Sequence, residues 1–149
     1  MSGKPPRLLL VEAQFYRHIA AELRRGAERA IAAEGASFES VSVPGVFEIP
    51  AALAFAARGA SEFDGFVALG CVIRGETTHY DYICAESARA LQDLAVRDGL
   101  AIGYGILTVE SEAQALVRAS PDGRDKGGEA VRACLAVLAL KRRFADRAS

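Results

Sequence analysis

Four short apolar segments, separated by stretches in which apolar residues recur with a helical period, constrain the fold of this chain more than any other feature. The segments are residues 8–11, 38–43, 65–71 and 101–108. Two of them are apolar on both alternating faces, over 66–69 and 102–107, which is typical of strands covered on both sides in a parallel sheet. Strands that alternate with helices favour βαβ units. We therefore predict an α/β fold, a flavodoxin-like three-layer αβα sandwich with a central four-stranded parallel sheet.

Five segments repeat their apolar residues with the helical period. We predict helices from about Phe15 to Gly35, over 50–58, from about Thr78 to Gly99, over 110–119 and over 129–144. Phe15 would open the apolar face of the first helix. The last helix would turn four residues inward, namely Val131, Cys134, Leu135 and Leu138.

Length and composition exclude several classes of protein. The 149 residues fit one domain, 1–149, that can hold a core without metal or disulfide. A net charge of −1 offers no basic excess for nucleic acid. No apolar run is long enough for a membrane span or a signal peptide, so we expect a cytoplasmic protein. Three cysteines without a CxxC pair and two histidines cannot complete a zinc site.

The polar motifs follow the predicted strands. Val43-Pro44-Gly45 follows the second strand, Ile73-Arg74-Gly75 follows the third, and Thr108 ends the fourth. The carboxyl ends of parallel strands meet at one edge of the sheet, where such folds bind their ligands. The sequence lacks GxGxxG, GxxxxGK[ST], GxSxG and HExxH. The residue types leave acid/base work on a bound phosphorylated compound as the open catalytic class.

The segment GCVIRGETTHYD at 70–81 predicts a turn followed by a helix start. Thr77 or Thr78 can cap this helix, and the free amides of its first turn favour an anion such as phosphate. Glu76 adds a carboxylate nearby, so a cation from elsewhere would be needed, and Arg118 and Arg124 are the candidates. The alternative is a capped helix start that binds nothing.

His79 would lie on the first turn of that helix, at the rim of the pocket. An imidazole titrates near neutral pH and can move protons in both directions. The alternative for a lone histidine is a surface or core residue without chemistry. His18 keeps that alternative, because it lies within the first helix beside Arg17 and Glu22, with no turn nearby.

The segment VPGVFEIP at 43–50 predicts a loop at the same edge, between Pro44-Gly45 and a helix that begins at Pro50. Val46, Phe47 and Glu48 would be exposed there, with backbone groups for a flat heterocycle and a carboxylate for hydroxyl groups. The alternative for Glu48 is an acidic residue that favours a helix start by charge alone.

Two further residues are candidates for ligand contacts. Phe15 follows the first strand directly and could stack on a planar ring. Lys126, in DKGGEA at 125–130, could hold an anion or a ring oxygen. Its alternative is a helix-start residue paired with Asp125 or Glu129.

Together, VPGVFEIP, GCVIRGETTHYD and DKGGEA resemble the 6,7-dimethyl-8-ribityllumazine synthase family, transferases of riboflavin biosynthesis. The resemblance runs from Glu12 to about Leu138. It implies condensation of 5-amino-6-(D-ribitylamino)uracil with 3,4-dihydroxy-2-butanone 4-phosphate to the lumazine. An imine forms, phosphate leaves, and ring closure loses water. The resemblance implies no metal and no organic cofactor.

The resemblance also implies a role for each candidate. His79 would transfer protons, and Phe15 would stack on the pyrimidine. The other substrate-binding residues would be Val46, Phe47 and Glu48 for the ring and the ribityl chain; Cys71, Val72 and Ile73 for the pyrimidine; Glu76, Thr77 and Arg118 for the phosphate; Tyr104 for the pocket wall; and Lys126 in support.

The family further implies a homopentamer with shared active sites, in which Tyr104 and Arg118 come from the adjacent chain. The partners would be the two small-molecule substrates and other copies of the chain, with no nucleic acid and no membrane. Some members stack pentamers or build shells of sixty chains, and the sequence does not decide among these assemblies.

Four positions depart from the family's common residues. Tyr16 replaces Asn, Tyr104 replaces Phe, Ser120 replaces Gly, and Asp125 replaces Asn before Lys126, where it could weaken the pull of that lysine on an anion. These departures bear on affinity and rate more than on reaction class.

Two other readings stay open at this point. One is a low-activity paralogue that serves as a ligand-binding or assembly module. The other is an unrelated flavodoxin-like receiver or flavin carrier. A receiver would need an acidic cluster at the end of the first strand, where Glu12 stands alone.

Overall fold

Four parallel strands form one sheet, in the order β2-β1-β3-β4, in the computed structural model, which describes residues 3–59 and 62–148. The strands are β1 (Arg7–Ala13), β2 (Ser37–Val43), β3 (Gly65–Ile73) and β4 (Ile102–Val109). In the centre of the sheet, Leu8 of β1 is aligned with Phe38 on one side and Gly65 on the other. All four predicted strands are confirmed, and their ends differ from the predicted ones by at most two residues.

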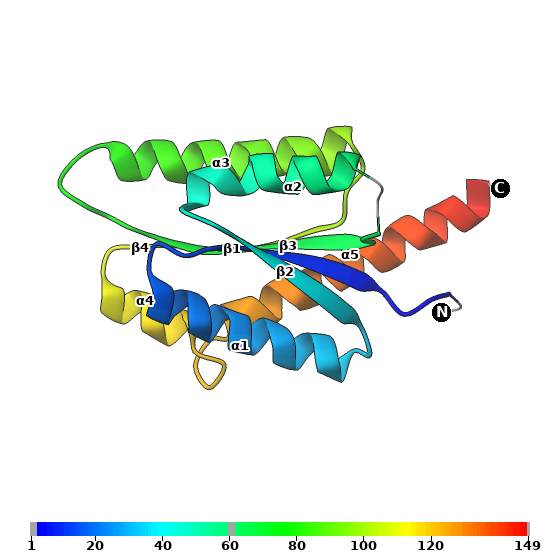
Figure 1. Ribbon diagram of the computed structural model, residues 1–149, viewed down its shortest axis with the longest axis horizontal. Coiled ribbons are helices and arrows are strands. Elements are labelled where there is room, and N and C mark those ends of the chain that lie inside the picture. The colour runs from blue at the N-terminus through cyan, green and yellow to red at the C-terminus, as the bar shows by residue number, and fades with distance from the viewer. Residues whose placement is uncertain (1–2, 60–61, 149) are drawn as a thin grey trace.

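Helices cover both faces of this sheet, which confirms the predicted three-layer fold (Figure 1). On one face lie α2 (Ile49–Arg58) and α3 (His79–Arg97); on the other lie α1 (Arg17–Ala33), α4 (Glu112–Ala119) and α5 (Lys126–Ala148). A short 3-10 helix, η1 (Val46–Glu48), leads into α2. Among the described residues, none of the helices combines the length and apolarity needed to cross a membrane.

The side chains of β1 alternate between two cores. Leu8 and Leu10 pack with α1 and α5, whereas Leu9 and Val11 pack with α2 and α3. Each of these four side chains is at most 1% exposed, and burial of a Leu or Val side chain contributes about 1.5–3 kcal/mol to stability. This double burial is the physical reason why the central strands are apolar on both faces.

The start of α5 was predicted incorrectly. The helix begins at Lys126, three residues before the predicted position 129. The glycine pair 127–128 does not break it, because Gly127 lies against the Leu23 carbonyl of α1, where a side chain would not fit. The Asp125 carboxylate caps the helix by accepting a hydrogen bond from the Gly128 N–H at 3.2 Å. Gly127 therefore serves close packing of α5 on α1, whereas a Cβ on Gly128 would overlap the capping carboxylate of Asp125.

Two other helix starts differ from the prediction. Phe15 does not open the apolar face of α1, which begins at Arg17 and leaves the Phe15 ring 74% exposed. The helix predicted from 110 begins at Glu112, because the Ser111 hydroxyl caps it by accepting from the Gln114 N–H. Positions 1–2, 60–61 and 149 of the predicted domain lie outside the described residues.

Candidate active site

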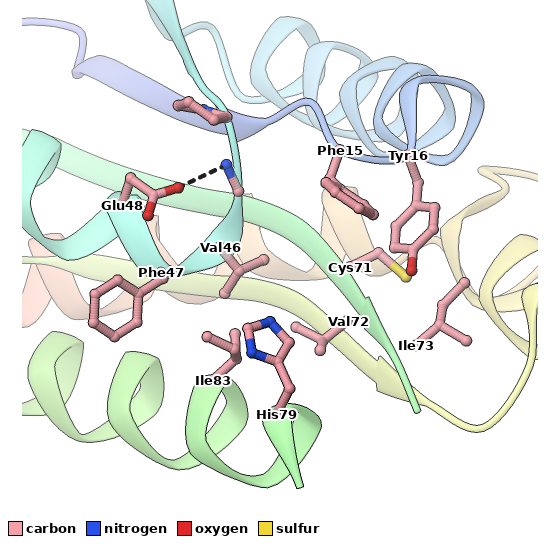
Figure 2. A pocket seen from close by; sticks show the side chains of 12 residues that line it. Phe15, Tyr16, Val46, Phe47, Glu48, Cys71, Val72, Ile73, His79 and Ile83 are labelled. Atoms are coloured by element: carbon pink, nitrogen blue, oxygen red, sulfur yellow. Dashed lines mark hydrogen bonds between the residues drawn. The ribbon is translucent and has the colours of Figure 1, made fainter. Parts of the chain in front are cut away.

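A cavity of about 390 Å³ opens at the carboxyl edge of the sheet, where β1, β2 and β3 end (Figure 2). Its walls come from the β1–α1 connection, η1, the end of β3 and the first turns of α3. Eight of the predicted site residues line it together, namely Phe15, Val46, Phe47, Glu48, Cys71, Val72, Ile73 and His79. The sequence reasoning did not predict a lining role for Tyr16, Pro44, Gly45 and Ile83.

The segment from Val46 to Glu48 is a helical turn, so the prediction of an exposed loop was wrong in part. Val46 is buried in the core under α2 and α3, whereas Phe47 and Glu48 face outward. The Gly45 N–H donates to Glu48 Oε1 at 3.0 Å, and this bond holds the carboxylate at the rim (Figure 2). The second carboxylate oxygen remains available to accept bonds from hydroxyl groups of a ligand.

Phe15 and Tyr16 form an aromatic pair at the mouth of the cavity. Their ring centroids lie 4.9 Å apart at an interplanar angle of 81°, an edge-to-face arrangement. Tyr16 is partly buried against the core under α1, whereas Phe15 is largely exposed. Burial raises the pKa of the Tyr16 hydroxyl, so this group stays protonated at neutral pH. Tyr16 therefore packs against and supports the exposed ring of Phe15.

The end of β3 lines the cavity through Cys71, Val72 and Ile73. Burial raises the pKa of the Cys71 thiol to about 12, so it is not a thiolate nucleophile near neutral pH. Cys71 and Cys134 are buried, and Cys84 is partly buried. The chemistry at this wall is therefore that of backbone groups and apolar surface.

His79 is the first residue of α3, and its ring points into the cavity (Figure 2). Ile83, one helical turn later, lies on the same side, and this spacing was the signal that could have identified it. No hydrogen bond or ion pair ties the imidazole to another residue in the described part of the chain. Both ring nitrogens can therefore serve a ligand.

The hydroxyl of Thr77 accepts a hydrogen bond from the His79 N–H at 3.3 Å, whereas Thr78, the N-cap residue of α3, makes no capping bond with its side chain. Glu76 and Thr77 are exposed in the turn before the helix, outside the cavity lining. His18, by contrast, lies in α1 and bonds to Glu112 Oε1 at 2.9 Å. Of the two histidines, only His79 faces the cavity.

Arg74 fixes the turn that carries Glu76 and Thr77. Its Nε donates to Glu110 Oε2 at 2.8 Å, and its guanidinium lies 4.2 Å from the centroid of the Tyr80 ring. Asp81 adds a longer ion pair at 3.5 Å. The hydrogen bond to Glu110 raises the pKa of Arg74. This role of Arg74 in holding the turn could not be predicted from the sequence, because Glu110 is 36 residues away along the chain.

The remaining predicted residues line other cavities of the same chain. Arg118 and Lys126 lie in a cavity of about 260 Å³ between β4 and the α4–α5 connection. Tyr104 lies in a third cavity, of about 290 Å³, between β4 and α3. The Asp125 carboxylate faces the first turn of α5 and Arg132. Lys126 pairs with Glu129 at 3.1 Å, and Glu129 is one of the two partners considered for this lysine in the sequence. Within one chain, the cations and His79 therefore line separate cavities.

Comparison with known proteins gives one consistent result. A family model described as 6,7-dimethyl-8-ribityllumazine synthase matches residues 5–142. A protein of that name from Bartonella tribocorum is 52% identical over 143 residues, covering 96% of this chain and 95% of the relative. The 6,7-dimethyl-8-ribityllumazine synthase 1 of Rhizobium meliloti is 54% identical, covering 95% of each chain. The 6,7-dimethyl-8-ribityllumazine synthase of Sphingopyxis alaskensis is 56% identical, covering 92% of this chain and 96% of the relative.

Proposed function

This chain belongs to the 6,7-dimethyl-8-ribityllumazine synthase family, and from that premise we propose how it carries out the reaction. The enzyme condenses 5-amino-6-(D-ribitylamino)uracil with 3,4-dihydroxy-2-butanone 4-phosphate and releases phosphate and water. The observation that carries the proposed site is the convergence of His79, Phe15 and Glu48 on one cavity at the carboxyl edge of the sheet.

The pyrimidine lies in this cavity with its ring against Phe15. The exposed ring of Phe15, held edge-on by Tyr16, offers a flat apolar face for stacking. Backbone groups of Cys71, Val72 and Ile73 bond the edge of the heterocycle. Val46 and Phe47 complete the wall, and Glu48 accepts hydrogen bonds from the ribityl hydroxyl groups through the oxygen that the Gly45 amide leaves available.

The butanone phosphate lies beside His79, with its phosphate at the start of α3. The dipole of this 19-residue helix favours an anion at its first turn, and the Thr77 hydroxyl, which accepts from the His79 N–H, can donate its own proton to the phosphate. Glu76 in the same turn is a carboxylate, so charge balance requires a cation. Arg118 supplies that cation from a neighbouring chain, because within its own chain it lines a different cavity from His79.

His79 transfers protons between the reacting groups. Formation of the imine requires the ketone oxygen to gain protons and leave as water, and the later steps require removal of protons from carbon and nitrogen. An imidazole without a fixed partner can perform both tasks near neutral pH and typically contributes about a hundredfold or more in rate. Holding both substrates together supplies a larger part of the effect, roughly 7–11 kcal/mol at best.

The assembly that completes the site is a homopentamer. Head-to-tail contact in a ring brings two different surfaces of the chain together, so it can place Tyr104, Arg118 and Lys126 of one copy against the His79 cavity of the next. We expect a single domain, located in the cytoplasm, that binds neither nucleic acid nor membrane. These expectations rest on the short apolar runs and the net charge of −1.

The test mixes both substrates with purified protein and follows the lumazine chromophore, while light scattering measures the mass in the same buffer. We expect turnover and a particle of five chains of 15.8 kDa, or a multiple of five. Bound substrate without turnover would indicate the ligand-binding module instead. A monomer with full activity would overturn the shared site.

A further inference from the structure

Three cations gather around the cavity between β4 and the α4–α5 connection. Arg118, Arg124 and Lys126 line it, and Glu129 is the only carboxylate in the lining. Three cations against one carboxylate leave an excess of two positive charges, in a chain whose net charge is −1. A phosphate monoester carries about −1.5 to −2 charges at neutral pH, so the cavity matches the charge of such a group.

Two of these cations are already engaged within the chain. Arg118 Nη1 donates to the Gln114 carbonyl at 3.2 Å, one turn earlier in α4. Lys126 Nζ pairs with Glu129 Oε1 at 3.1 Å. The Arg124 guanidinium makes no hydrogen bond, ion pair or ring contact with any residue in the described part of the chain. Arg124 is therefore the cation of this cavity with all its donors available.

The backbone around Arg124 is fixed even though its side chain is exposed. The Arg124 N–H donates to the Val117 carbonyl at 3.0 Å, and the flanking Asp125 N–H donates to the Ser120 carbonyl at 3.0 Å. Gly123 lies so close to the Val117 carbonyl that a Cβ would not fit. A side chain presented from a fixed backbone loses less conformational freedom when it binds a ligand.

We propose that Arg124 is a further phosphate-binding residue, which grips the phosphate of the four-carbon substrate beside Arg118. This inference rests on the proposed function, because it places the cationic cavity of one chain against the His79 cavity of the next. A guanidinium binds phosphate oxygens bidentately, and two guanidiniums can hold different oxygens of one phosphate. The ribitylaminouracil carries no phosphate, so Arg124 would select between the two substrates.

The experiment measures both KM values, and inhibition by inorganic phosphate, for Arg124→Ala and Arg124→Gln. We expect the KM for the butanone phosphate and the inhibition constant of phosphate to rise about tenfold or more, since a hydrogen bond to a charged group is lost. The KM for the pyrimidine should stay within about twofold, and Arg124→Lys should restore part of the phosphate affinity. Light scattering checks that each variant retains the wild-type mass.

Two control variants separate this inference from the proposed function. Arg97→Ala removes an exposed arginine that lines a groove between α2 and α3, and it should change neither KM.

Arg118→Ala tests the proposed phosphate site itself. If Arg118→Ala raises the KM for the phosphate substrate and both Arg124 variants leave it unchanged, the inference is overturned and the proposed function stands. Equal increases in both KM values at Arg124 would also overturn it. If neither arginine matters, the proposed phosphate site fails.

Discussion

Gly26 of α1 lies directly against the carboxylate of Asp125, the residue that caps α5. A Cβ on Gly26 would overlap Asp125 Oδ1 and would come within 3.3 Å of the Gly128 nitrogen, which is the hydrogen-bond donor to that oxygen. Asp125 itself has a φ of 50°, which aspartate tolerates better than most residues. The packing of α1 on α5 and the cap of α5 therefore depend on each other.

Gly26→Ala is expected to destabilise the protein by about 1 kcal/mol, although alanine is the better helix former by a similar amount. The added methyl group displaces the capping carboxylate, and loss of the cap together with overpacking outweighs the gain in helix propensity. Urea unfolding at one protein concentration measures the change. In an Asp125→Gly background the same substitution should become stabilising, because the obstructing carboxylate is gone. Gly59→Ala, whose nearest contact would be an ordinary 3.5 Å, is the control for crowding.

His79→Ala is expected to lower kcat about a hundredfold and to leave measurable turnover. The variant loses proton transfer, while the cavity still holds both substrates together. Steady-state rates at saturating substrate measure the loss. His18→Ala is the matched control, since this histidine is exposed and pairs with Glu112 outside the cavity. Unchanged turnover in His79→Ala would remove the imidazole from the mechanism.

Tyr16→Ala is expected to raise the KM for the pyrimidine about two- to tenfold, with little effect on the KM for the butanone phosphate. An aromatic pair contributes about 0.5–1.5 kcal/mol, and the Phe15 ring loses its edge-to-face support in this variant. Tyr16→Phe keeps the ring and should keep the wild-type value. An equal loss in Tyr16→Phe would show that the hydroxyl, and not the ring, matters.

Glu12 is expected to make stability depend on pH. Burial raises the pKa of this carboxyl above its ordinary value of 4.5, although Arg24, at 3.0 Å, and Ser40 oppose the shift and Glu28 adds to it. A raised pKa means that the folded chain binds the proton more tightly than the unfolded chain. The contribution of Glu12 to stability should therefore fall as the pH rises from about 4.5 through the folded pKa.

Urea unfolding of wild type and Glu12→Gln between pH 4 and pH 8 tests this dependence, because glutamine has no proton to lose. The free energy of unfolding of wild type, relative to that of the variant, should decline over this interval and level off above the folded pKa. A difference that grows with pH would mean that Arg24 dominates over burial.

The elements that could be predicted from the sequence are those whose signal is local. The strands β1 and β3 are buried on both faces, so their apolar runs are continuous and unambiguous. His79 could be placed at a pocket because a strand end, a glycine turn and a helix start follow one another within ten residues. The strings shared with the family then identified the neighbouring wall residues.

The features that escaped prediction depend on contacts between distant segments. Gly127 lies inside α5 because α1 approaches there, and no local pattern reports that approach. Arg74 reaches Glu110 across two elements, and Tyr16 lines the cavity because the β1–α1 connection turns toward Cys71 (Figure 2). The proposed placement of Tyr104, Arg118 and Lys126 at the active site would depend on a second chain, whose arrangement no single-chain pattern can give.

The separation of His79 and Arg118 into different cavities has a genetic counterpart. In the proposed ring with shared sites, copies of the gene that carry His79→Ala and copies that carry Arg118→Ala would each encode assemblies with no intact site. Co-expression would yield mixed rings in which an Arg118→Ala subunit, donating its histidine, can meet a His79→Ala subunit that donates its arginine. Two defective alleles expressed together would then meet a riboflavin requirement that neither allele meets alone.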